Sequence, residues 1–79
     1  DDETAGSVHG TIDVVEARSL LEVSLLEITD EHGNRWRFEA KGYDGFSPSH
    51  LREHKLQGLP VTVTYHMEDG VRMIDEIID

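Results

Sequence analysis

The chain has 79 residues, enough for one domain with a hydrophobic core of modest size. Seventeen acidic residues against seven basic ones give a formal net charge of -10, which repels phosphate backbones and makes nucleic acid a poor partner. The absence of cysteine excludes disulfides, thiolate metal sites and a cysteine nucleophile.

The first seven residues, DDETAGS, are acidic and small, with nothing to bury. We expect residues 1–7 to form a flexible lead-in and residues 8–79 to form a single domain. A polar lead-in without an initial methionine is typical of a segment that follows a removed signal peptide, which favours an extracytoplasmic location. A cloned fragment explains it equally well.

Two strands are expected next. Apolar and polar residues alternate from Val8 to Val14, and Gly10 lies where a bent barrel strand needs a kink. From Leu20 to Thr29 the sequence LLEVSLLEIT is strongly apolar, and its change of phase at Leu25 and Leu26 implies a bulge in a strand. A helix also fits the spacing of these apolar residues, but the segment that follows favours the strand.

That following segment, DEHGN over residues 30–34, is typical of a hairpin turn. A third strand is expected after it, because Trp36, Phe38 and Ala40 alternate with charged residues. The connection KGYDGF, residues 41–46, is rich in glycine and carries two aromatic rings.

A helix is predicted from Ser47 to Gly58. Ser47 can cap its first turn with Pro48 as the first helical residue, and Gly58 can take the left-handed position that ends it. Pro60 prevents continuation. The stripe that we expect to cover one end of a barrel consists of Leu51, His54, Leu56 and Leu59.

The last two strands are joined by the turn EDG. The segment PVTVTYHM alternates clearly between apolar and polar residues, and a last strand is expected over Val71–Ile78. We predict a three-residue loop, because it pairs Met67 with Val71 and Tyr65 with Met73 and so keeps apolar residues on one face.

Three strands, a helix and two strands, with a bent first strand, resemble the OB-fold, a five-stranded Greek-key barrel. The runs SPSHLREH and LPVTVTYHMEDGVRMIDEI also resemble those of small bacterial OB-type domains to which no activity is attached. We therefore expect an all-β, OB-like barrel with one helix between strands three and four.

The resemblance implies ligand binding on the face of strands two and three and on the loops beside it. We expect a non-enzymatic domain that binds a protein partner or a small ligand without a cofactor, and its oligomeric state stays open. Single-stranded nucleic acid would need aromatic rings in a basic groove, whereas this face has mixed charge. No apolar run approaches the ~20 residues of a membrane-spanning helix. The candidate binding residues are Arg35, Arg37, Tyr43 and Phe46.

Two histidines in the expected helix support an alternative function, metal binding. His50 and His54 are four residues apart and share a helix face, where such pairs chelate zinc or copper. The segment HLREH also matches the H-x-x-E-H pattern of one class of zinc protease, but a hydrolase would need a third ligand and a substrate cleft. Histidines that simply flank Leu51 explain the same pattern.

A second metal set resembles that of the periplasmic OB-fold chaperones of copper and silver efflux systems. These proteins bind a soft ion with methionines, a histidine and a capping tryptophan. The corresponding residues in this chain are His32, His66, Met67 and Met73, with Trp36 as the cap. Methionines on an apolar strand face are also ordinary core residues. The alternative hypothesis is therefore an extracytoplasmic copper or zinc chaperone or sensor.

Overall fold

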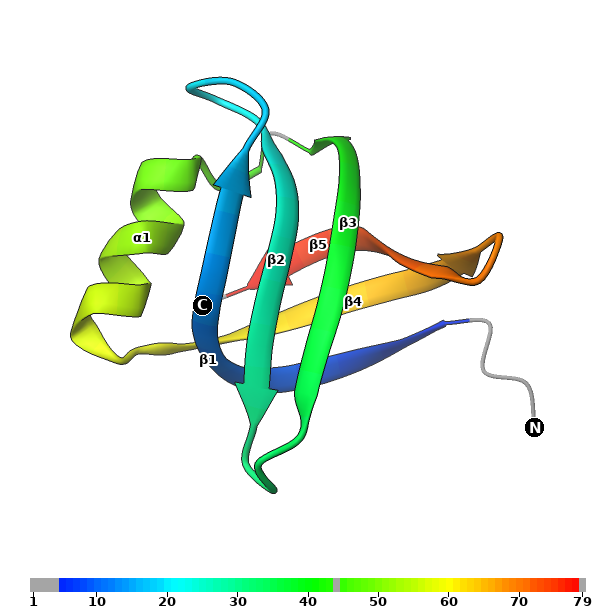
Figure 1. The fold of residues 1–79 in the computed structure, drawn as a ribbon, viewed down its shortest axis with the longest axis horizontal. Helices are drawn as coiled ribbons and strands as arrows, with labels where there is room; N and C mark the ends of the chain where they lie inside the picture. Colours follow the sequence, from blue (N-terminus) through cyan, green and yellow to red (C-terminus); the bar gives the residue numbers. More distant parts are fainter. Residues whose placement is uncertain (1–4, 44, 79) are drawn as a thin grey trace.

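The structure of the protein, a computed structural model, describes residues 5–43 and 45–78. Within these ranges five strands form a closed barrel in the order β1-β2-β3-β5-β4, and one helix lies beside it (Figure 1). This confirms the predicted fold class, with the helix between the third and fourth strands. In chain order the elements are β1 (Ala5–Ala17), β2 (Val23–Asp30), β3 (Arg35–Tyr43), α1 (Pro48–Gln57), β4 (Pro60–Glu68) and β5 (Val71–Ile78).

Strand β1 is long and bent, and it takes part in two pairings. Residues Ala5–Thr11 pair with β4, whereas Gly10–Ala17 pair with β2. Gly10 belongs to both pairings, and a Cβ atom there would lie 2.2 Å from the carbonyl oxygen of Thr29. The predicted kink at Gly10 thus coincides with the point where two strands approach most closely. The expected lead-in falls partly on residues 1–4, outside the described residues, whereas residues 5–7 already belong to β1.

The apolar run of the second segment is a strand, as predicted, but it begins at Val23 rather than at Leu20. Its register against β3 shifts between Val23 and Leu25, so that Val23 and Leu26 both enter the core. The strand therefore has a bulge, but it lies between Val23 and Leu25 rather than at Leu25 and Leu26, where it was predicted. Leu20 and Leu21 lie in the exposed loop before the strand.

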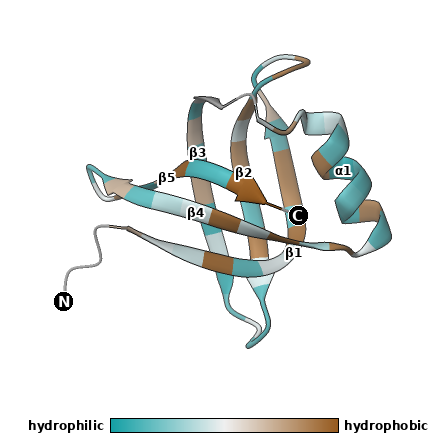
Figure 2. Cartoon of the chain, turned by 180° about the vertical axis from the view of Figure 1, so that it is seen from behind, coloured by the Kyte–Doolittle hydropathy of each residue, from teal (hydrophilic) through white to brown (hydrophobic). Residues whose placement is uncertain are grey.

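The barrel encloses one apolar cluster to which every strand and the helix contribute. Figure 2 shows apolar bands on the strands and a helix that is largely hydrophilic. The clustered side chains are Val8, Ile12, Val23, Leu26, Ile28, Phe38, Leu51, Val61, Val63, Tyr65, Ile74 and Ile77.

Helix α1 has the predicted ends. The Ser47 side chain accepts a hydrogen bond from the His50 backbone N–H, and Gly58 ends the helix with a φ of 69°. The helix packs mainly on β1. Leu51 is fully buried, but Leu56 is 87% exposed and Leu59 is 43% exposed, so the predicted stripe was wrong for Leu56 and Leu59.

The turn between β4 and β5 differs from the prediction. Asp69 and Gly70 both have positive φ, 53° and 79°, and Glu68 pairs with Val71 across a two-residue loop. The three-residue loop was wrong because Asp-Gly favours the type I′ turn, whose twist matches that of the strands it joins.

The two-residue turn places a charged side chain on the core side of β5. Met67 now pairs with Arg72, and the Arg72 guanidinium lies 4.7 Å from the ring centroid of Trp36 and 5.9 Å from that of Tyr65. These two rings can stabilise the cation. The alternation of apolar residues disfavours a charged residue on this face of β5. Arg72 is nevertheless accommodated there, at one end of the barrel.

Candidate functional site

The loop between β1 and β2 presents two leucines to solvent. The backbone N–H of Arg18 donates to the carbonyl of Glu22 at 2.9 Å. The Ser19 hydroxyl accepts hydrogen bonds from the N–H groups of Leu21 and Glu22 at 3.3 and 3.2 Å. These bonds hold the loop in a defined turn. The Leu20 side chain is 91% exposed and that of Leu21 is 69% exposed.

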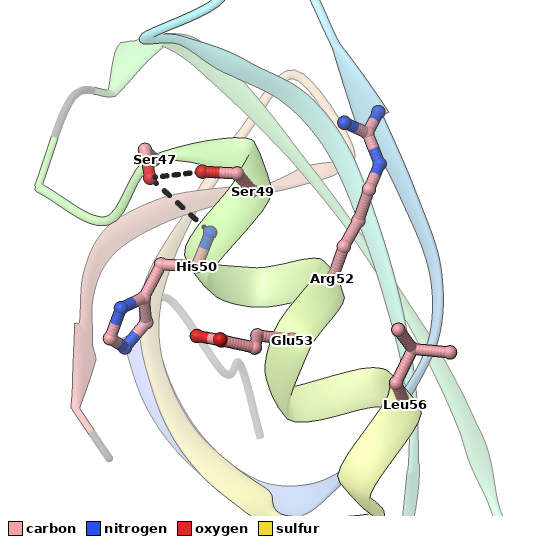
Figure 3. Close-up of a pocket in the computed structure, with 6 residues that line it drawn as sticks. All are labelled: Ser47, Ser49, His50, Arg52, Glu53 and Leu56. Atoms are coloured by element: carbon pink, nitrogen blue, oxygen red, sulfur yellow. Dashed lines mark hydrogen bonds between the residues drawn. The ribbon is translucent and has the colours of Figure 1, made fainter.

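The outer face of α1 continues this exposed surface. Arg52, Lys55 and Leu56 are three and four residues apart, so they share one side of the helix. Figure 3 shows Arg52 and Leu56 on one side of α1, with His50 and Glu53 pointing to the other. The inner face is fixed by the buried Leu51.

Three shallow hollows over the loop and the helix share lining residues. Arg52 lines both the hollow beside Leu20 and the hollow beside Leu56. His50 lines the hollow beside Leu56 and also the third, between the loop and the segment before α1. The hollows therefore form one continuous surface. The large apolar side chains that line the hollows define what we call the loop–helix surface, and they are Leu20, Leu21, Phe46 and Leu56.

Three aromatic rings gather at one edge of this surface. The ring centroid of Phe46 lies 4.6 Å from that of His50 and 6.4 Å from that of His54, and the two histidine rings are 4.9 Å apart. Phe46 also packs against the core cluster. The helix thus brings together the two histidines of the predicted metal pair. Among the described residues no group of three histidine or carboxylate side chains is placed to hold a metal ion.

The four predicted binding residues do not converge. Arg35 lies 3.8 Å from Asp13 and 4.0 Å from Glu27, at the start of β3. Arg37 is exposed on the same face of that strand. Tyr43 ends β3, roughly 26 Å along the strand from Arg35 at ~3.3 Å per residue, and Phe46 follows it. The structure therefore separates the basic pair from the aromatic pair.

His66 is bound into a network of charged side chains that spans three strands. Its Nδ1 lies 2.6 Å from Asp75 and its Nε2 lies 3.6 Å from Glu68, which in turn accepts a hydrogen bond from Lys41 at 2.9 Å. The hydrogen bond with Asp75, with a smaller contribution from Glu68, raises the pKa of His66 above its ordinary value. The hydrogen bond from Lys41 lowers the pKa of Glu68. This network lies on the outer face of the barrel.

The methionines of the predicted soft-metal set lie on opposite faces of the sheet. Met73 pairs with His66 and with Glu39, so it belongs to the outer face, where it is only 7% exposed. Met67 packs against the core cluster. His66 and Met73 are therefore neighbours, while Met67 points away from them.

Trp36 is held by the hairpin that precedes it. Its indole N–H donates to Asp30 at 2.9 Å, and the backbone N–H groups of Asn34 and His32 donate to the same carboxylate, each at 2.9 Å. The bond from Trp36, followed by that from Asn34, lowers the pKa of Asp30 to about 2. The Arg72 guanidinium lies over the Trp36 ring, 4.7 Å from its centroid.

Sequence reasoning missed most of the loop–helix surface. Leu20 and Leu21 were assigned to a strand and Leu56 to the buried stripe, and all three are exposed. A usable signal was Ser19, because a serine hydroxyl can accept hydrogen bonds from backbone N–H groups two and three residues further on and so favours a turn. That signal would have ended the strand assignment before Val23.

Comparisons with protein-family models, with curated proteins and with solved structures gave no match to this chain. In the part of the chain that the structure describes, no helix combines the length and the apolar character needed to cross a membrane.

Proposed function

We propose that this barrel belongs to the OB-fold superfamily and that it is a non-enzymatic domain that binds a protein partner. The strand order β1-β2-β3-β5-β4, with a bent β1 and a helix after β3, supports the first part. The second part rests on the loop–helix surface.

The observation that carries the binding proposal is the exposure of three leucines on adjoining elements. Leu20, Leu21 and Leu56 are 91%, 69% and 87% exposed, respectively, although the core of the barrel is otherwise well filled. Full burial of a leucine side chain is worth about 1.5–3 kcal/mol, so a partner that covers them gains considerable free energy. Contiguous apolar surface of this kind is typical of interaction sites.

The shape of the surface favours a protein over a small molecule. Small ligands are usually enclosed by concave, mostly apolar pockets. The hollows here are shallow and open, and they are bordered by side chains that project outward, such as Leu56 and Arg52. Projecting side chains of this kind fit into the grooves of a partner.

The proposal is tested with a synthetic helical peptide that carries leucines at positions i, i+3, i+4 and i+7 with glutamine between them. Its addition should shift the NMR methyl signals of Leu20, Leu21 and Leu56. The double variant Leu20→Ser/Leu56→Ser should keep its melting temperature and lose these shifts. Ile78→Ser is the matched control, since Ile78 is half-exposed but lines none of the three hollows. Shifts confined to the face of Arg35 and Arg37, or binding that survives the double variant, would contradict the proposal.

One observation favours metal binding as a second candidate. The rings of His50 and His54 lie 4.9 Å apart on successive turns of α1, a spacing suited to chelation of one ion. Zn(II) or Cu(II) should then raise the melting temperature saturably, and chelator should reverse the rise. His54→Gln should abolish the effect. An unchanged melt with zinc, Cu(I) and Cu(II) would exclude this function.

A further inference from the structure

The loop–helix surface is bordered by three cations that have no ion pair with any described residue: Arg18, Arg52 and Lys55. Elsewhere on the barrel, Arg35 and Lys41 each lie within 4.0 Å of a carboxylate, whereas Arg37 and Arg72 have no ion pair with any described residue. Arg18 and Arg52 line the same hollow as Leu20. Lys55 adjoins Leu56 on the outer face of α1.

These three cations lie near one apolar surface in a chain of net charge -10, in which acidic residues outnumber Lys and Arg by 17 to seven. One carboxylate, that of Glu53, lines the hollow beside Leu56. Figure 3 shows Glu53 on the His50 side of α1, away from Leu56. Glu22 accepts a hydrogen bond from the Ser19 hydroxyl at 3.4 Å. The surface therefore joins exposed leucines to positive charge, while most of the remaining protein is negative.

We propose that the occupant of the loop–helix surface is an acidic protein segment with apolar side chains. Its apolar groups lie against Leu20 and Leu56, and its carboxylates pair with Arg18, Arg52 and Lys55. This inference rests on the proposed function and specifies the partner. Complementary charge at the border of an apolar contact gives specificity and speeds association.

The remaining charge distribution argues against an anionic membrane as the occupant. A bilayer surface is far larger than the loop–helix surface, so it also meets the acidic parts of the barrel and is repelled by them. A single segment contacts only the basic border and avoids this repulsion.

The test compares three peptides with identical leucine spacing and with glutamate, glutamine or lysine at the intervening positions. The glutamate peptide should bind at least about fivefold more tightly than the glutamine peptide, and the lysine peptide should bind most weakly. Raising the salt from 50 to 500 mM should reduce the difference between the peptides, because exposed ion pairs are screened.

Charge variants then identify the cations that cause the preference for the glutamate peptide. Arg18→Gln and Arg52→Gln should each weaken binding of the glutamate peptide about 1.5- to 5-fold while leaving that of the glutamine peptide unchanged. Arg37→Gln is the matched control, because Arg37 is exposed and lines none of the three hollows. An equal loss in the control variant would overturn the assignment of the cations.

The outcomes separate this inference from the proposed function. If the glutamate and glutamine peptides bind equally and both are lost in Leu20→Ser/Leu56→Ser, the binding surface stands and the acidic partner is overturned. If no peptide responds to the leucine variants, both proposals fail. Binding to vesicles of anionic phospholipid without binding to any peptide would overturn the inference in favour of a membrane. Self-association in sedimentation that is lost in the leucine variants would overturn it in favour of a second copy.

Discussion

Replacing Leu51 with alanine should show how strongly α1 is held on the barrel. Leu51 is fully buried and belongs to the core cluster, so the change removes buried methyl groups and leaves a cavity at the barrel end. Changes of this kind cost about 2–5 kcal/mol of unfolding free energy. A domain of 79 residues has a total stability of roughly 4–12 kcal/mol, so the loss is a large fraction of it. We expect the melting temperature to fall by about 10–30 °C.

The same substitution at Leu56 is the matched control. Leu56 lies five residues further along the same helix and is 87% exposed, so Leu56→Ala should change the unfolding free energy by no more than about 0.5 kcal/mol. Urea denaturation followed by circular dichroism measures both variants under identical conditions. Equal losses in the two variants, or a loss below about 0.5 kcal/mol in Leu51→Ala, would refute the packing of α1 through Leu51.

Two further predictions concern the sheet. Gly10→Ala should destabilise the protein by about 3 kcal/mol or more in urea denaturation, because the new Cβ would lie 2.2 Å from a backbone oxygen of β2 that no side-chain rotation can move; near-normal stability would contradict this close approach. The NMR-titrated pKa of His66 should lie above 6.5 and return toward 6.5 in Asp75→Asn. Because the folded-state pKa is the raised one, this contact stabilises the fold below about pH 6.5 and the stabilisation is lost as pH rises through the raised pKa. A His66 pKa at or below 6.5 in the unmodified protein would show that the contact with Asp75 does not form.

The parts of the fold that local chemistry determines were predictable from the sequence. Ser47 and Gly58 specify the ends of α1 through one hydroxyl acceptor and one left-handed backbone conformation, and neither depends on the rest of the chain. The alternation of buried and less buried residues along β4 and the hairpin turn before β3 likewise depend on residues close together in the sequence. Since these elements leave few ways to close a small sheet, the barrel was predictable from their order.

The register of the β4–β5 hairpin was not predictable from the apolar pattern. That pattern favours a loop that excludes Arg72 from the core side, whereas the Asp-Gly turn places it there. The placement is tolerated because the rings of Trp36 and Tyr65 receive the guanidinium. Trp36 comes from another hairpin, so the deciding contact is a tertiary one that pairing rules do not include.

The exposure of the leucines in the candidate site was also not predictable from the pattern of apolar residues. In the run LLEVSLLEIT, Leu20 and Leu26 have similar neighbours, yet Leu20 is 91% exposed and Leu26 is fully buried. Their fates differ because the bonds around Ser19 close the loop before Val23, and a hydrophobicity pattern contains no information on where pairing begins. Candidate binding residues chosen for charge and aromaticity therefore included Phe46 but missed the three leucines of the loop–helix surface.

The two ends of the barrel differ in how completely their side chains are partnered. At the hairpin end, Trp36 is bonded to Asp30 and covered by Arg72, so its apolar ring and its N–H group are both used within the fold. At the helix end, Leu20 and Leu56 remain exposed. Exposed leucines add to the risk of aggregation, and their place on an ordered loop and a capped helix is the observation on which the proposed partner contact rests. This contrast is the reason for seeking the function at the helix end rather than on the face of strands two and three.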